Sequence, residues 1–286
     1  MAGDNVRYNV PFRAPALPYP PQVYDAQSFE EFNKILRIYF NQLDNALRNA
    51  MAVQEPYELQ VARGTVPGAS IVNIFGYQVA VSTSSICVWE NVSAYAYPAS
   101  AVVMALVSTS ATDAGAATVL VSGLAADYSA LSEVVTLNGT NAVNTTNAFL
   151  RINNIRMTAP ASGQVSNVGT ITAVNGGVTY GKILPTVGQT QMSQYSVPLG
   201  YSFYLTRVNS YAQQDGGTNN FNTYSVVAKT PAVTYSVLQS PFFQAYDAFR
   251  DGPFKYAEKT SVQWQTKTDS NTSSVGMVIE GLLIAN

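Results

Sequence analysis

The 286-residue chain contains no histidine and a single cysteine. Histidine is the usual general base near neutral pH and the commonest metal ligand, so Ser-His and Cys-His nucleophile pairs and histidine zinc sites are excluded. Cys87 cannot form an intrachain disulfide, and its apolar neighbours in SSICVWEN indicate a buried, unreactive thiol. We therefore expect neither a cofactor nor a metal site.

Charged residues are also scarce. They make up 11% of the chain, against roughly 25% in ordinary soluble domains, whereas tyrosine is abundant with 18 residues. The net charge is −2 and the basic residues are scattered from Arg7 to Lys267, so nucleic acid is not an expected partner. Low charge with abundant tyrosine is typical of a subunit whose surface is largely covered by neighbouring subunits.

The sequence also lacks membrane and export signals. No apolar run reaches the roughly 18 residues of a membrane-spanning helix, and the stretch MAGDNVRYNV does not have the pattern of a signal peptide. We expect a protein that is made in a cytoplasm and has no membrane partner.

Paired carboxylates are the remaining route to catalysis, because glycoside hydrolysis needs two acids and no histidine. The acidic residues beyond Glu58 are Glu90, Asp113, Asp127, Glu133, Asp215, Asp247, Asp251, Glu258, Asp269 and Glu280. Most lie beside Gly, Ser or Asn, which favours solvated turns, and the stretches DGGTNN and DSNTSS lack the full calcium-loop pattern. The sequence thus predicts no catalytic residue, with a carboxylate glycosidase as the enzymatic alternative.

Residues 1–27 predict an extended docking arm. Prolines at positions 11, 15, 18, 20 and 21 exclude a helix and a central strand, because each fixes φ and removes an amide donor. Such an arm cannot bury itself. It either lies on another subunit or protein or is a disordered terminus.

Residues 28–51 predict a single helix that begins with a capping box of Ser28 and Glu31. Its apolar positions alternate by four and three residues, which is the spacing of a self-associating seam, and other apolar side chains flank this seam. The seam comprises Phe32, Leu36, Tyr39, Leu43, Ala46 and Ala50. We predict that Phe32, Leu36, Tyr39, Leu43 and Leu47 serve docking and oligomerisation. The alternative is a helix packed on its own β domain.

From residue 57 onward, short β-branched runs alternate with turn-forming residues, and no amphipathic helix intervenes. The predicted fold class is mainly β: an antiparallel, jelly-roll-like β-sandwich body preceded by the extended arm and one N-terminal helix. A loop near 92–100 separates a small β segment, 57–97, from the body, 98–286. We expect Trp89 to be a buried structural residue and Asn138-Gly139 to occupy the two positive-φ positions of a type I′ turn.

Several motifs follow one another in a fixed order between residues 64 and 157. They include a Phe-Gly segment, Trp89, the turn ATDAGAA and the strand-turn EVVTLNGT. This stretch resembles a β-rich module in virion structural proteins of tailed bacteriophages, and the likeness continues more weakly to residue 286. The segment LRIYFNQLDNAL similarly resembles a short N-terminal helix of small phage structural proteins.

The resemblance implies a non-enzymatic virion subunit, made in the host cytoplasm, that docks by its arm and helix as a fibre- or spike-like appendage of the head-tail or tail exterior. Its implied partners are copies of itself, in a homotrimer, and other virion proteins of the capsid, portal, adaptor or tail. One alternative is a capsid decoration protein. Another, from a different class, is a carbohydrate- or receptor-binding module that recognises a glycan on the host surface.

Overall fold

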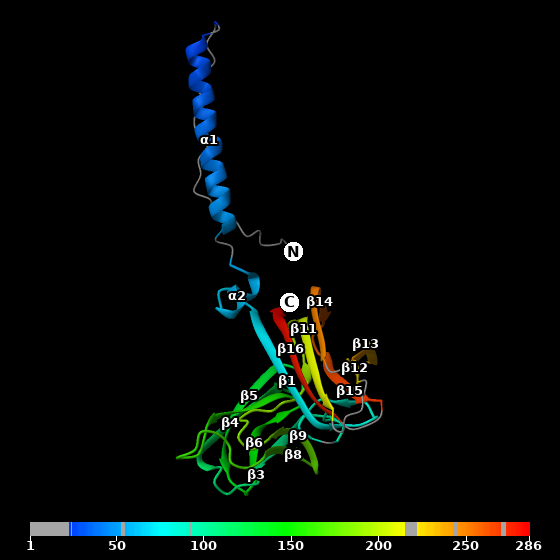
Figure 1. Ribbon diagram of the computed structural model, residues 1–286. Helices are drawn as coiled ribbons and strands as arrows, with labels where there is room; N and C mark the ends of the chain where they lie inside the picture. The colour runs from blue at the N-terminus through cyan, green and yellow to red at the C-terminus, as the bar shows by residue number, and fades with distance from the viewer. Residues whose placement is uncertain are drawn as a thin grey trace. The chain divides into compact units, whose positions relative to one another are not determined.

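The computed structural model describes residues 23, 25–52, 55–91, 93–214, 222–242, 245–269 and 273–286 (Figure 1). The chain divides into two compact units, Met1–Gln60 and Val61–Asn286, which we call the N-terminal and C-terminal units. Helix α1 (Ala26–Ala52) lies in the first, and the short helix α2 (Tyr57–Ala62) spans the division. The predicted N-terminal helix is confirmed. The predicted arm lies almost entirely outside the described residues and stays a prediction.

The residue that caps α1 is Asp25 and not Ser28. One carboxylate oxygen of Asp25 accepts a hydrogen bond from the Gln27 amide at 3.1 Å, and the other accepts from the Ser28 amide at 3.2 Å and from the Ser28 hydroxyl at 2.7 Å. The hydroxyl is the main cause of the lowered pKa of Asp25. The predicted capping box was therefore wrong, because an acidic cap begins the helix earlier than expected.

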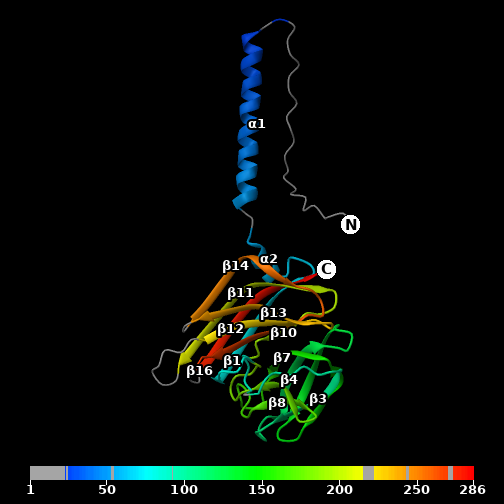
Figure 2. The same ribbon diagram turned by 90° about the vertical axis from the view of Figure 1, so that its right-hand side faces the viewer.

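The C-terminal unit is built from antiparallel strands (Figure 2). They are β1 (Ala69–Val81), β2 (Ile86–Cys87), β3 (Val102–Ser108), β4 (Ala114–Leu124), β5 (Ala130–Asn138), β6 (Val143–Phe149), β7 (Arg151–Ala159), β8 (Ile171–Asn175), β9 (Val178–Ile183), β10 (Gln194–Ser196), β11 (Tyr201–Gln214), β12 (Asn222–Lys229), β13 (Thr234–Phe242), β14 (Ala245–Tyr256), β15 (Ser261–Thr268) and β16 (Ser273–Ala285).

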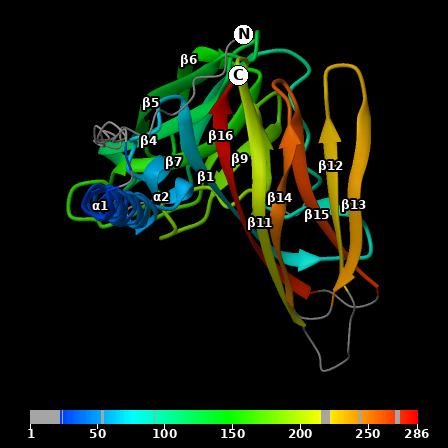
Figure 3. The ribbon, with the colours of Figure 1, turned by 90° about the horizontal axis from the view of Figure 1, so that it is seen from above.

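The described strands form four sheets, which we name after a central strand. The β16 sheet has the order β1-β16-β11-β14, and Figure 3 shows β16 between β1 and β11. The β15 sheet has the order β10-β15-β12-β13, with β2 also paired to β15. The β3 sheet has the order β6-β3-β8-β9, and the β4 sheet the order β5-β4-β7. Strands β3 to β9 therefore pair only among themselves, as an insertion between β2 and β10.

Two hydrophobic cores form in the described part of this unit. The first lies between the β16 and β15 sheets and includes Phe203, Tyr224 and Trp264. The second lies between the β3 and β4 sheets and includes Met104 and Phe149. The four sheets form a propeller-like ring and not a clear jelly-roll sandwich. The mainly β, antiparallel prediction is confirmed, but the single jelly roll was wrong because the inserted strands build a core of their own.

The segment 57–97 is joined to the rest of the C-terminal unit along most of β1. This strand pairs with β16 from Ala69 opposite Ile284 to Val81 opposite Ser273. Within β1, Ile74 and Val81 face the first core. The first and last strands of the unit thus lie side by side.

A buried arginine connects the two pairs of sheets. Arg151, at the start of β7, donates from Nε to the Ser261 hydroxyl on β15 at 3.1 Å. Its Nη1 donates to the carbonyls of Pro98 at 3.1 Å and Leu150 at 2.7 Å. The guanidinium also lies 4.7 Å from the centre of the Tyr97 ring. In the described residues no carboxylate pairs with it, so carbonyl dipoles and an aromatic face stabilise the charge.

The short strand β10 adds a second connection. Asn153 on β7 donates to the Ser196 carbonyl and accepts from the Ser196 amide, both at 2.9 Å. The Gln194 side chain donates to the Ile152 carbonyl. Because β10 also pairs with β15, these side chains join β7 to the β15 sheet much as a further strand would.

The turn at Asn138-Gly139 differs from the prediction. Gly139 has φ +61°, but Asn138 is not at positive φ, and the Asn141 amide donates to the Asn138 carbonyl at 3.1 Å. The central residues are therefore Gly139 and Thr140, with positive φ at the first alone, as in a type II′ turn. The predicted type I′ turn was wrong because the turn lies one residue further along the chain.

Asp113 organises the loop beside this turn and is fully buried. Its carboxylate accepts from the Ser108 hydroxyl at 2.6 Å and from the amides of Val168 and Gly169 at 2.8 Å each. Its carbonyl accepts from the Gly139 amide at 2.9 Å. The expectation of a solvated turn was wrong for this acid, because backbone amides take the place of water.

Replacing Arg151 should destabilise the C-terminal unit. We expect Arg151→Ala to lower the free energy of unfolding by about 2–4 kcal/mol, because the carbonyls of Pro98 and Leu150 lose a charged donor while buried. The exposed Arg156→Ala is the matched control and should change stability by less than about 0.5 kcal/mol. Urea unfolding followed by tryptophan fluorescence measures both, and equal effects would show that the buried contacts contribute nothing.

Substitutions at two glycines allow the cost of backbone strain alone to be compared with the cost of strain plus a steric clash. Gly139 and Gly176 both have positive φ, but a Cβ on Gly139 would lie 2.9 Å from the Ala111 backbone, whereas a Cβ on Gly176 would meet nothing within 4 Å. Gly176→Ala should cost about 1 kcal/mol, and Gly139→Ala about 1–3 kcal/mol more, because the Ala111 loop must move. Thermal unfolding compares the two variants. Similar losses of stability in the two variants would mean that the Ala111 loop moves at little cost.

Candidate functional site

Helix α1 presents apolar side chains over a broad sector. Successive residues rotate by about 100°, which places Phe29, Phe40 and Leu47 along one line of the helix, beside Leu36. The exposed fractions of Phe29, Phe40 and Leu47 are 56%, 58% and 51%. Such a surface has the chemistry to bind another apolar surface.

The predicted docking residues all lie on this helix. Phe32, Leu36, Tyr39 and Leu43 are half-buried, and Leu47 is exposed. The sequence interpretation placed Phe29 outside the seam, although it precedes Phe32 by three residues and so continues the same alternation. The three-residue step from Phe29 to Phe32 was the signal that could have placed Phe29 in the seam.

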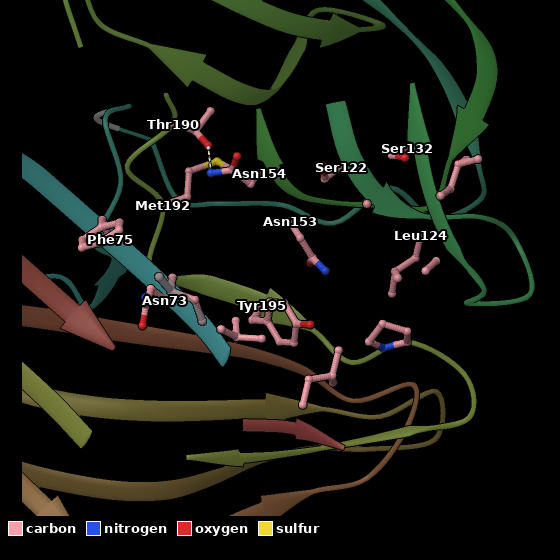
Figure 4. A pocket seen from close by; sticks show the side chains of 17 residues that line it. Asn73, Phe75, Ser122, Leu124, Ser132, Asn153, Asn154, Thr190, Met192 and Tyr195 are labelled. Atoms are coloured by element: carbon pink, nitrogen blue, oxygen red, sulfur yellow. Dashed lines mark hydrogen bonds between the residues drawn. The ribbon is translucent and has the colours of Figure 1, made fainter. Parts of the chain in front are cut away.

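A pocket of about 420 Å³ lies in the C-terminal unit, between β1 and β10 on one side and the β4 sheet on the other (Figure 4). Its lining residues come from several segments far apart in the sequence. They are Val72, Asn73, Ile74, Phe75, Ser122, Gly123, Leu124, Ala130, Leu131, Ser132, Asn153, Asn154, Thr190, Met192, Tyr195, Pro198 and Leu283. None of these residues is charged, so the pocket offers neutral polar groups on an apolar background.

The polar groups of the pocket differ in whether they already have partners. Asn153 is held by Ser196, and Asn154 donates to the Thr190 hydroxyl at 3.3 Å. The side chains of Asn73, Ser122 and Ser132, by contrast, make no hydrogen bond within the described residues.

Tyr195 is the most buried of the lining polar residues whose side chain has no partner. The residue is 8% exposed, and its ring centre lies 5.1 Å from that of Phe203. Its hydroxyl has no hydrogen-bond partner among the residues that the structure describes. Burial raises the pKa of this phenol, so it stays protonated and can donate.

Sequence reasoning missed the pocket. Its polar residues come from β1, β4, β5 and β7, the loop before β10, and β10 itself, and no local motif marks any of them. Among the lining residues no nucleophile is paired with a base. The lining offers hydrogen bonds and apolar contact to a ligand.

Glu90 is buried elsewhere in the C-terminal unit, with an exposed fraction of 6%. Its oxygens lie near the amides of Gln191 and Leu184, but neither contact has the geometry of a hydrogen bond. Burial raises the pKa of Glu90 to about 8, against the smaller opposing effects of those amides and of Lys182. The expected solvated turn was wrong for Glu90 also, and the folded protein holds a proton there at neutral pH.

Trp89 and Cys87 lie in the second core. The Trp89 indole donates to the Ser93 carbonyl at 2.8 Å, and its ring meets the Tyr95 ring edge-on at 5.0 Å. Cys87 is 1% exposed, and burial raises the pKa of its thiol to about 12, which leaves it unreactive. Both residues pack in the protein interior, and neither lines the pocket.

The described residues contain neither a metal-binding cluster nor a membrane-spanning helix. No cluster of three or more Cys, Asp or Glu side chains lies close enough to bind a metal ion. Neither described helix combines the length and hydrophobicity needed to cross a membrane.

Comparisons with known proteins do not identify a family for this chain. No protein-family model and no curated protein matches the chain. A chain in the solved "Structure of infectious bursal disease virus Gt strain" is similar at 9% sequence identity, over 81% of this chain and 78% of that chain, with a TM-score of 0.20. A TM-score this low carries no argument about fold or function. The phage resemblance of residues 64–157 therefore stays a prediction.

The proton on Glu90 predicts a pH dependence of stability. The pKa of Glu90 is about 8 in the folded protein, above its value in the unfolded chain. Its contribution is therefore fully present below about pH 4.5 and is lost as the pH rises through 8, by up to about 1.4 kcal/mol per pH unit. We expect Glu90→Gln to remove this slope and to exceed the wild type in stability at pH 9.

Urea unfolding between pH 5 and 9 measures this effect. The exposed Glu58→Gln is the matched control and should keep the wild-type slope. An unchanged slope in Glu90→Gln would show that Glu90 is ionised in the folded protein.

Proposed function

We propose that the chain is a non-enzymatic structural subunit of a virus particle, which assembles with copies of itself and docks through α1. The observation that carries this proposal is the broad apolar sector of α1, with large side chains such as Phe29, Phe40 and Leu47 about half exposed. Leaving this much apolar surface in water is unfavourable, so the helix needs a covering partner.

The spacing of this sector favours copies of the same helix as partners. Phe29, Phe32, Leu36, Tyr39 and Leu43 alternate by three and four residues, which is the repeat of a helix that packs against others of its kind. Large side chains kept at this spacing from Phe29 to Leu43, about two heptads, allow copies of the helix to interlock along their length.

The width of the sector favours three helices over two. Phe40 and Leu47 each follow a core position of the repeat by one residue, at the flank of the seam. A two-helix seam covers mainly the core positions and leaves this flank in water. In a bundle of three, each helix has two neighbours, so a wider sector is buried. The proposal is therefore a homotrimer.

The assignment to a virion rests on the resemblance of residues 64–157 to tailed-phage structural proteins and on the low charge of the whole chain. Within this proposal the subunit is a fibre- or spike-like appendage of the head-tail or tail exterior. A capsid decoration protein would use the same helix against the capsid shell. Imaging of particles that carry a tag after residue 286 would locate the subunit on the tail or on the shell.

Substitutions on α1 test the assembly. We expect the wild type to be a trimer, and Leu36→Asp and Phe40→Asp each to raise the dissociation constant at least about tenfold, because burying an unpaired carboxylate costs several kcal/mol. Lys34→Asp is the control, since Lys34 lies in the exposed polar sector. Sedimentation velocity measures all four proteins.

Three outcomes would contradict the helix assignment. A monomeric wild type would remove self-assembly altogether. A trimer that only Lys34→Asp disrupts would place the contact on the polar sector. A dimer that tolerates Phe40→Asp would show that the flank of the seam stays in water and that two helices suffice.

A further inference from the structure

We propose that the pocket between β1, β10 and the β4 sheet binds a neutral carbohydrate. This inference goes beyond the proposed docking function, because the pocket belongs to the C-terminal unit and uses no residue of α1. Its volume of about 420 Å³ lies within the range of pockets that enclose small ligands, roughly 300–1,000 Å³.

The Tyr195 hydroxyl is the first indication of a ligand. The ring of Tyr195 is buried, but its hydroxyl is not among the buried side-chain atoms that lack a partner, so the hydroxyl reaches the open space of the pocket. Here no described residue supplies a partner, and the side chain lines the pocket. Figure 4 shows Tyr195 beside the same opening as Asn73 and Asn153. A ligand hydroxyl in this opening would take the place of water as the partner of the Tyr195 hydroxyl.

The remaining free polar groups indicate the chemical class. The amide of Asn73 and the hydroxyls of Ser122 and Ser132 all lack partners within the described residues. Each of these side chains can both donate and accept, which matches the hydroxyl groups of a sugar. Asn73 approaches from β1, whereas the two serines come from β4 and β5, so the groups can reach opposite edges of one ligand.

The absence of charge narrows the class further. A charged ligand would lose its hydration in this pocket without meeting an opposite charge in the lining. A purely apolar ligand would leave Tyr195, Asn73 and the serines unpaired. Phe75, which is 40% exposed, and Met192 offer apolar surface for the C–H faces of a sugar ring. Neutral hydroxyl groups on a carbon ring therefore fit both parts of the lining.

Binding of defined sugars to the full chain tests the proposal. The probes are glucose, galactose, N-acetylglucosamine and their β-linked disaccharides at millimolar concentration, with glucuronate as the charged comparison. Saturation-transfer NMR detects contact, and calorimetry measures the affinity of each sugar that binds. We expect at least one neutral sugar to bind and glucuronate to bind at least tenfold more weakly.

Matched variants then locate the site. Tyr195→Phe removes only the hydroxyl and should weaken binding about threefold to tenfold, whereas Tyr211→Phe, at an exposed tyrosine outside the pocket, should have no effect. Phe75→Ala should weaken binding at least about tenfold. Tyr77→Ala, on the same strand with a similar exposed fraction but outside the lining, is its control.

Each result supports or overturns the proposal. Loss of affinity in the two pocket variants alone, with unchanged thermal unfolding, supports it. Equal affinity in Tyr195→Phe and Tyr211→Phe, or in Phe75→Ala and Tyr77→Ala, would place any sugar elsewhere. Stronger binding of glucuronate, or no binding of any neutral sugar by the folded wild type, would show that the pocket does not take this class.

Discussion

The contact between Arg151 and the surrounding carbonyls positions much of the C-terminal unit. A guanidinium cannot be deprotonated in a protein, so this buried charge must be met by oriented dipoles. Pro98, Leu150 and Ser261 supply them from segments that are far apart in the sequence. Because Arg151 begins β7, the contact also fixes where Asn153 and Asn154 stand. The wall of the pocket thus depends on the same interaction that connects the two pairs of sheets.

The connection between the two pairs of sheets is partly polar. Strands β3 to β9 supply most of the second core, to which Cys87, Trp89 and Met192 also contribute, and the first core lies between the β16 and β15 sheets. Backbone and polar side chains also lie where the two pairs of sheets meet, and these groups require hydrogen bonds. Asn153, Gln194 and Ser196 provide them. The pocket lies beside these hydrogen bonds, between β1 and β10 on one side and the β4 sheet on the other.

Local patterns in the sequence were sufficient for the helix and for the antiparallel strands, because a period of 3.5 or 2 is visible within a few residues. They were not sufficient for strand pairing. The partners Ala69 and Ile284 are more than 200 residues apart, and no local feature marks them. The burial of Glu90 and Asp113 was hidden for the same reason, since short neighbours such as Ser and Asn occur in solvated turns and buried loops alike. The pocket could not be predicted for both reasons, because its residues come from distant segments and no local motif marks them.

The scarcity of charge has a different meaning in each unit. On α1 the charged residues occupy one sector and leave the opposite side to large apolar groups, which favours protein contact. In the pocket charge is absent from the lining, and the hydroxyl of Tyr195 stays protonated because burial raises its pKa. Glu90, whose pKa is about 8, lies outside the pocket. Protonation therefore acts on the stability of the fold, whereas recognition in the pocket depends on shape and neutral hydrogen bonds.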